Sequence, residues 1–269
     1  MMKLCTLLPN QYLQPYISRY WLWENESCLP KIFSGTGTEL MFTYGKPLHV
    51  IHKGQILTLP KSYVMMPRFD CYQMQADGPY GFISVRFRAG AFRHFCPNPS
   101  TEFIDAFIAV DDLWGMKGLA LQDELLSTAD AAGKIKIIEQ YLMRVLLKNQ
   151  KMDKYVDAAV HLLLYDYQHI NIDELCRSFF LSQRQMERKL KTAVGVSPKG
   201  FQKISRFEAL MKKLLLLREP KYLNMAMDYG YYDQSHFLKD CKKYLGEAPY
   251  SFLQEKNFLS HFYNEKLRI

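Results

Sequence analysis

The sequence of 269 residues lacks the marks of a secreted, metal-binding or membrane-spanning protein. Its six cysteines form no CxxC pair, and no His or Cys stands at zinc-ligand spacing, which argues against a disulfide framework and a metal knuckle. The apolar stretch near the N-terminus is too short for a secretion signal. No run approaches the roughly 18 apolar residues of a membrane span. We therefore expect a cytoplasmic protein with reduced thiols and no membrane partner.

Patterns typical of catalysis are also missing. The sequence has no Ser/His/Asp, Cys/His or paired-carboxylate spacing, so we predict neither an enzyme nor a cofactor. His49 and His52 would lie on opposite faces of an expected strand, which disfavours a metal site. Arg86 and Arg88 share one face of another expected strand and are candidates for holding an anionic effector. The favoured alternative is a surface pair or a partner for a buried acid.

Positive charge is concentrated in the C-terminal part of the chain. The formal net charge is +8, and residues 151–269 hold 20 Lys and Arg against 14 Asp and Glu. The first 150 residues are nearly balanced, with 15 against 13. Within residues 182–218 there are ten Lys and Arg and only two acids, Glu187 and Glu208. Phosphates are the natural partner of such a run, and binding to them should weaken steeply with salt.

Two different residue patterns along the chain predict an α+β protein of two domains. Residues 31–95 contain short alternating runs such as GQILTLP (54–60) and GFISVRFRAG (81–90), which predict an antiparallel sheet or a small cupin-like barrel. From residue 134 onward, apolar residues recur at helical spacing. We place the boundary in the polar stretch 148–154. This gives a β-rich sensing or dimerisation domain with helices over 1–150 and an all-α domain over 151–269.

The C-terminal domain contains an internal repeat. Asn171 with Glu174, and Ser182 with Gln185, are capping boxes that predict helices starting near 172 and 183. A third helix is expected from Pro198 to about Arg218. The stretch SQRQMERKLKTAVG (182–195) then matches DQSHFLKDCKKYLG (233–246) at an offset of 51 residues. Each copy reads as the second helix of a helix-turn-helix, the element that enters the major groove of DNA.

These two stretches carry a family resemblance. LSQRQMERKLKTAVGVSPKGF and YGYYDQSHFLKDCKKYLGEAPYSF resemble the tandem helix-turn-helix domain of AraC-type transcription regulators. The second is close to that family's pattern G-[FY]-x-[DS]-Q-S-[HYT]-F-x-[RK]. The N-terminal pieces YISRYW, GTELMFTYG and VRFRAGAF resemble the sensor-like domain of one subgroup, whose ligand is generally unknown. The resemblance implies a sequence-specific regulator that binds double-stranded DNA as a monomer or homodimer. RNA polymerase and a small-molecule effector are candidate partners, and activation and repression both stay open.

The resemblance also implies roles for individual residues. The implied base-reading residues are Arg184, Glu187 and Arg188 in the first motif and Gln234, Ser235 and Lys239 in the second. Arginine can bind guanine, and glutamine can bind adenine, through two hydrogen bonds each. The implied phosphate contacts are Lys191, Lys199, Lys242 and Lys243. Phe180 stands where the family usually has the glycine of the first turn, and a bulky residue with positive φ is strained there. We therefore expect the first turn to differ from the second.

Two other readings stay open at this stage. One is an enzyme whose sheet domain acts on a sugar or nucleotide while the helices tether it to DNA, which would need an activated cysteine or a metal cluster. The other is a DNA-binding adaptor without any ligand. A barrel filled with side chains would favour the adaptor, whereas a roomy pocket reached by Arg86 or Arg88 would favour effector sensing.

Overall fold

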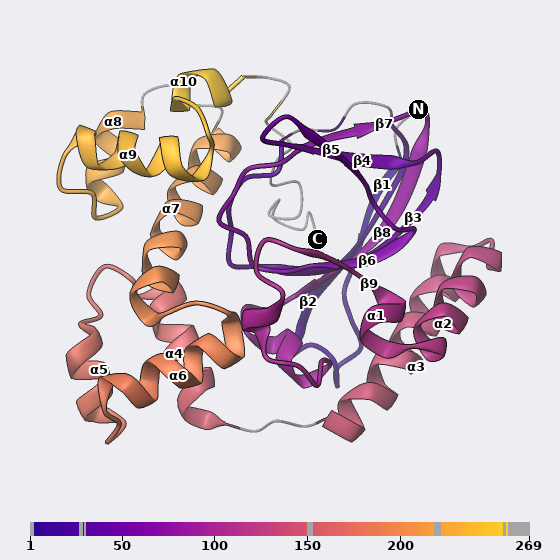
Figure 1. Ribbon diagram of the computed structural model, residues 1–269, viewed down its shortest axis with the longest axis horizontal. Helices are drawn as coiled ribbons and strands as arrows, with labels where there is room; N and C mark the ends of the chain where they lie inside the picture. Colours follow the sequence, from indigo (N-terminus) through magenta and orange to yellow (C-terminus); the bar gives the residue numbers. More distant parts are fainter. Residues whose placement is uncertain are drawn as a thin grey trace.

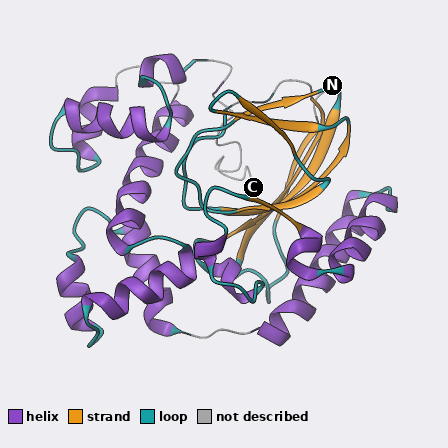
Figure 2. Cartoon of the chain, in the orientation of Figure 1, coloured by secondary structure: helices purple, strands orange, loops and turns teal. Residues whose placement is uncertain are grey.

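A computed structural model describes residues 3–26, 29, 31–149, 153–217, 222–254 and 257. Strands dominate the first part of the chain, and helices make up the rest, as Figure 2 shows by colour. The α+β fold class is confirmed. The boundary predicted after residue 150 falls within residues 150–152, which lie outside the described residues. None of the helices that the structure describes has the length and hydropathy needed to cross a lipid bilayer.

The N-terminal part is built on two antiparallel sheets. A six-stranded sheet has the order β1-β2-β8-β3-β6-β9, and a three-stranded sheet has the order β5-β4-β7. The strands are β1 (Lys3–Leu7), β2 (Ile17–Glu26), β3 (Thr38–Gly45), β4 (Leu48–His52), β5 (Gln55–Thr58), β6 (Ser62–Met65), β7 (Gln73–Ala76), β8 (Tyr80–Phe87) and β9 (Phe107–Ala109).

Both faces of the larger sheet are covered. Along β2, Tyr20 and Leu22 enter one hydrophobic core, while Trp21 and Trp23 alternate into a second core. This alternation follows from the two-residue period of a strand. The second core is shared with the smaller sheet, whose Val50 on β4 packs into it. The space between the two sheets is thus filled by large side chains.

Helices complete the fold on either side of these sheets (Figure 1). The N-terminal part also contains two short 3-10 helices, η1 (Ala91–His94) and η2 (Ser100–Glu102), and three helices, α1 (Val110–Trp114), α2 (Met116–Ser127) and α3 (Ala131–Asn149). The apolar face of α3 packs into the core on the outer side of the larger sheet through Ile138, Leu142 and Leu146. The C-terminal helices are α4 (Lys154–Tyr165), α5 (Ile172–Ser178), α6 (Gln183–Val194), α7 (Pro198–Leu217), α8 (Tyr222–Asp228), α9 (Gln234–Tyr244) and α10 (Pro249–Phe252).

The C-terminal helices form two units joined by α7. In the first unit, α4, α5 and α6 share a core that includes Met186 and Leu190. In the second, α8, α9 and α10 share a core that includes Phe237 and Cys241. The predicted helix starts at 172 and 183 are confirmed, because Asn171 caps α5 and Ser182 forms a full capping box with Gln185 on α6.

The turns before α6 and α9 begin with the same backbone geometry, although the second is one residue longer. Phe180 has a φ of 53° and Gly230 a φ of 82°. The Phe180 N–H donates to the Arg177 carbonyl at 3.1 Å, and the Gly230 N–H donates to the Met227 carbonyl at 3.0 Å. The expectation that Phe180 would alter the backbone at this position is therefore wrong. The phenyl group of Phe180 is 93% exposed, so the left-handed conformation costs backbone energy without forcing a clash in the core.

The N-terminal domain is packed against both units. Phe33 is fully buried in the core of the second unit, with ring centroids 6.1 Å from Phe207 and 5.6 Å from Phe252. Against the first unit, the Ser100 hydroxyl donates to the Ala193 carbonyl at the C-terminal end of α6. These contacts involve the parts of the helix-turn-helix units that face the sheet domain. The starts of α6 and α9 stay exposed.

Candidate nucleic-acid interface

The two candidate reading helices lie on the same side of the molecule. In Figure 1, α6 and α9 both run toward the sheet domain, so their N-terminal ends point away from it. Asp233 caps α9 by accepting from the His236 N–H at 2.7 Å, as Ser182 caps α6 by accepting from the Gln185 N–H at 3.2 Å. In each unit a capped first turn is therefore presented outward, the arrangement needed for entering a major groove.

All predicted base-reading residues are exposed on these two helices. The set comprises Arg184, Glu187, Arg188, Gln234, Ser235 and Lys239. Glu187 forms an ion pair with Lys191 one turn along α6, at 2.9 Å, and both side chains are about half exposed. His236, also on the first turn of α9, lies against the Tyr231 ring with its Nε2 3.1 Å from Arg206.

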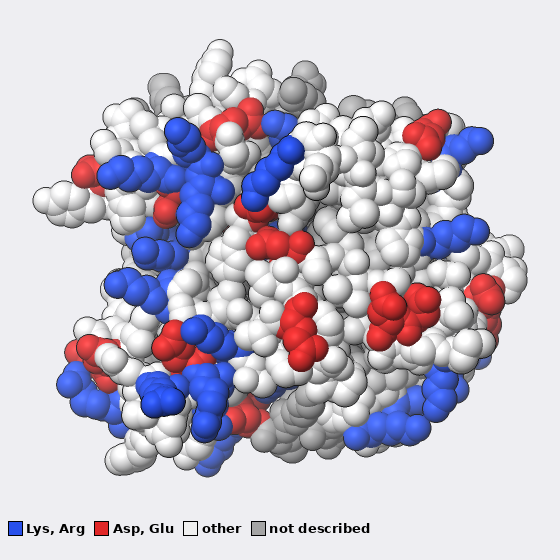
Figure 3. Space-filling model, viewed as in Figure 1, with Lys and Arg blue, Asp and Glu red and all other residues white. Residues whose placement is uncertain are grey.

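The basic run 182–218 is divided between an outer and an inner face of the helices. Lys199, Lys242 and Lys243 are exposed, in keeping with the phosphate contacts predicted for them. Lys189 instead pairs with Asp153, and Lys212 pairs with Glu208. Arg218 lies outside the described residues. In Figure 3 many Lys and Arg side chains lie over the helical units at the left of the view, with a few Asp and Glu among them.

Arg206 on α7 holds α9, the second candidate reading helix, in place. Its guanidinium lies 4.1 Å from the centre of the Tyr231 ring and 3.1 Å from the Asp240 carboxylate on α9. It also donates to the Gly230 carbonyl in the turn. In the sequence, Arg206 is one of the ten basic residues of the run 182–218, for which phosphates were the expected partner. Its side chain is only 15% exposed, and both of its neighbours in the chain, Ser205 and Phe207, are buried.

A cleft of about 900 Å³ lies between the sheet domain and the helical units. Both predicted effector residues, Arg86 and Arg88, line it, so they face the domain interface rather than the interior of the sheet domain. Six basic side chains line the cleft in all: Arg19, Arg86, Arg88, His94, His161 and Lys212.

Arginines on neighbouring strands of the larger sheet line this cleft. Arg19 on β2 lies directly opposite Arg86 on β8, and Arg86 lies directly opposite Glu39 on β3. Like charges in directly opposed positions of neighbouring strands are destabilising. Burial, followed by the charges of Arg86 and Arg88, lowers the pKa of Arg19. Arg86 donates to Glu39 at 2.9 Å, so the favoured alternative, a partner for a buried acid, holds for Arg86.

The helical domain supplies a second acid to this cluster. Glu208, from the middle of α7, is 2% exposed and lies 3.6 Å from Arg86. Its carboxylate accepts hydrogen bonds from the backbone N–H and the hydroxyl of Thr36, at 2.8 and 2.7 Å. Glycines flank Thr36 because a Cβ at Gly37 would overlap the Arg86 guanidinium, only 1.8 Å away. The sequence analysis did not identify Glu208. The small residues of the SGTGT segment (34–38), which leave room for other groups against the backbone, were the available sign of a binding site at this place.

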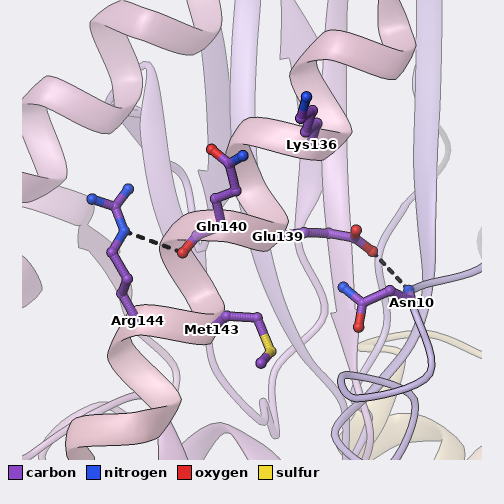
Figure 4. Close-up of a pocket in the computed structure, with 6 residues that line it drawn as sticks. All are labelled: Asn10, Lys136, Glu139, Gln140, Met143 and Arg144. Atoms are coloured by element: carbon purple, nitrogen blue, oxygen red, sulfur yellow. Dashed lines mark hydrogen bonds between the residues drawn. The ribbon is translucent and has the colours of Figure 1, made fainter.

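A second hollow of about 520 Å³ lies along α3 (Figure 4). Glu139 points from α3 toward the turn before β2, where it accepts from the Asn10 N–H at 2.8 Å and from the Tyr20 hydroxyl at 3.2 Å. Arg144 donates to the Gln140 carbonyl of its own helix. Glu139 therefore holds α3 to the sheet domain, and the polar groups of Glu139 and Arg144 already have partners within the fold.

Comparisons with known proteins agree with this geometry. Residues 175–255 match the family model of a helix-turn-helix domain, and residues 6–109 match a domain of unknown function (DUF6597). A comparison with curated protein sequences finds no match. A 1.65 Å structure of ToxT from Vibrio cholerae is similar in fold, with a TM-score of 0.52 at 11% identity over 87% of this chain and 97% of ToxT.

Another ToxT structure, from Vibrio cholerae O395, has a TM-score of 0.51 at 12% identity and covers 87% of this chain and 98% of its own. That protein is bound to (E)-4-(8-methylnaphthalen-1-yl)but-3-enoic acid. The shared fold extends over both the sheet domain and the helical units. With the match over residues 175–255, it shows that this chain carries a helix-turn-helix domain in its C-terminal part and shares the two-part fold of ToxT.

Proposed function

We propose that this protein is a sequence-specific regulator in which residues 151–269 bind double-stranded DNA and residues 1–150 control that binding. The observation that carries the proposal is the outward presentation of two similar capped helices, α6 and α9, on one side of the molecule. The 20 residues of α7 that connect the units span about 30 Å. That length is close to the roughly 34 Å between successive major-groove faces on one side of DNA.

Base reading is assigned to exposed residues of the first two turns of α6 and of α9. Arg184 and Arg188 on α6 are suited to guanine, and Gln234 on α9 is suited to adenine. Glu187, Ser235 and Lys239 complete the candidate set. The pairing of Glu187 with Lys191 supports a role for this acid in orienting the lysine toward a phosphate as well as in accepting from cytosine.

Genomic footprinting of the protein, followed by titration of the bound sites, tests this assignment. Replacing Arg188 or Gln234 by Ala should reduce the discrimination between matched and mismatched sites by about 1–3 kcal/mol for each lost pair of hydrogen bonds. Unchanged discrimination would remove that residue from the base-reading set.

Lys199→Ala is the matched control, because Lys199 is exposed at the start of α7 and is assigned to a phosphate. It should weaken binding to all DNA roughly equally and reduce the salt slope by about one. An altered base preference in this variant would contradict the division between reading and phosphate residues.

Effector control is the finer part of the proposal. The interior of the sheet domain is filled by side chains such as Trp21 and Trp23, which on its own favours the ligand-free adaptor. The cleft reached by Arg86 and Arg88 favours sensing, because its volume suits a small molecule and its lining is rich in positive charge. The naphthalenyl butenoic acid bound by ToxT supports an acidic ligand, and we place the effector in the cleft.

A further inference from the structure

The cleft between the domains holds more positive charge than its own acids balance. Arg19, Arg86 and Arg88 come from one end of the sheet, and Lys212 enters from α7. Two buried acids, Glu39 and Glu208, face this group, while a third acid that lines the cleft, Asp157, pairs with Arg93. The opposed pair Arg19 and Arg86 makes the arrangement unfavourable unless further negative charge is nearby. An acidic ligand would neutralise this excess positive charge.

Glu208 already occupies the position of such a ligand. It comes from the other domain, and its carboxylate is bound as a small anion would be, by a backbone N–H, a hydroxyl, the Arg86 guanidinium and the Lys212 ammonium. The glycines on both sides of Thr36 leave room for the Arg86 and Glu208 groups against the backbone. Removing this carboxylate would leave a preformed anion site that opens to the cleft.

We propose that a small organic molecule with a carboxylate or phosphate group binds in this cleft and takes the place of the Glu208 carboxylate beside Arg86. Four tyrosines, Tyr16, Tyr165, Tyr167 and Tyr229, line the same cleft and provide surfaces for the body of the ligand. Displacement of Glu208 releases the middle of α7 from Thr36. This inference rests on the proposed effector control and names its ligand class and its coupling residue.

The released helix is the one that joins the two reading units. While Glu208 is bound, α7 is tied to the sheet domain midway between α6 and α9. Loss of this polar contact leaves α7 held to the sheet domain by the packing of Phe33 against Phe207, a contact that allows the two units to adjust to the spacing of the grooves. The ligand is thereby coupled to DNA affinity, since it binds one arrangement of α7 in preference to the other.

Titration calorimetry with two probes, benzoate and inorganic phosphate, tests the site without DNA and separates the two acidic groups. Glu208→Gln removes the internal competitor, so it should bind the preferred probe at least about fivefold more tightly than the natural protein, the lower end of usual coupling factors. Arg88→Gln, at an exposed position of the cleft, should bind it at least about fivefold more weakly. Equal affinity of the Glu208→Gln variant and the natural protein overturns the competition, and absence of saturable binding to all three proteins overturns the site.

Hydrogen exchange of the Thr36 amide tests the displacement itself. Glu208→Gln should speed this exchange, and saturating probe should speed it in the natural protein, although ligands ordinarily slow exchange where they bind. Glu39→Gln is the matched control, because Glu39 also pairs with Arg86 but belongs to the sheet domain and does not contact α7 in the described contacts. Slower exchange at Thr36 with probe would show that the anion binds beside Glu208, which overturns the displacement.

DNA titration of the same proteins tests the regulatory consequence. Glu208→Gln should change the affinity for a bound site by at least about fivefold without any probe, and Glu39→Gln should not. Equal DNA affinity of all three proteins overturns the coupling to α7. If the natural protein binds no specific DNA, the proposed function fails, whereas probe binding and Thr36 exchange still decide the anion site.

Discussion

Phe180 shows how a single residue can depart from a family pattern without changing the turn it belongs to. It adopts a left-handed conformation at the same position as Gly230 in the second unit. For a residue with a Cβ this conformation costs about 1–2 kcal/mol. Glycine there would lose about 0.5–1 kcal/mol through its more flexible unfolded chain. Because the phenyl group is almost fully exposed, we expect Phe180→Gly to stabilise the first unit by about 0.5–1 kcal/mol in urea unfolding.

The equivalent change in the second unit is the control and should have the opposite sign. A Cβ at Gly230 would have its nearest neighbour at 3.5 Å, so the cost of Gly230→Ala is conformational rather than steric. We expect destabilisation of about 1 kcal/mol. Destabilisation by Phe180→Gly would mean that the phenyl group makes contacts that offset its backbone strain.

At the scale of an element, the start of α4 depends on one aspartate. Asp153 caps the helix by accepting from the N–H groups of Tyr155 and Val156, and it also binds Lys189 on α6. Burial alone would raise the pKa of Asp153, but the hydrogen bonds from Lys189 and these two N–H groups outweigh it and lower the pKa. The resulting stability is present above the unfolded pKa and is lost as the pH falls through the lower folded value.

Asp153→Asn should therefore make the first unit less sensitive to acid. The amide can still cap α4, but it cannot gain or lose the charge that binds Lys189. The expected result is a lower Tm at pH 6 and a smaller loss of Tm between about pH 4 and pH 2 than in the natural protein. Asp123→Asn, at an exposed position of α2, is the control. An equal loss of Tm in all three proteins would show that other carboxyl groups dominate the acid response.

The helices of the two units could be predicted because their signals are local. Asn171 and Ser182 lie next to the helices they cap, and the 51-residue repeat identifies the partner of α6. The buried and the exposed face of α7 could not be distinguished by such local signals. Glu208 sits in a basic run and reads as part of a solvated surface, yet its partner Thr36 is 172 residues away in the chain. Periodicity shows that a helix has a buried side, but it does not show which distant charge will meet it.

For the molecule as a whole, the sheet domain supplies part of the core of the second unit. The ring of Phe33 is fully buried among residues of α7, α9 and α10, including Phe207 and Phe252. The Ser34 hydroxyl beside it donates to the Tyr244 carbonyl at the end of α9. Two domains that merely touched would unfold independently, whereas a shared aromatic core couples their stabilities.

Phe33→Ala should consequently destabilise α9 although the substitution lies in the other domain. Loss of a buried phenyl group costs about 3–5 kcal/mol. Hydrogen exchange should show this loss of protection at the amides of α9, with a much smaller effect on α6, whose core does not contain Phe33. Phe33→Leu, which retains most of the buried volume, should cost roughly 1–2 kcal/mol. Unchanged protection of α9 in Phe33→Ala would show that the second unit is stable without the sheet domain, and the control of DNA binding would then have to act through α7 alone.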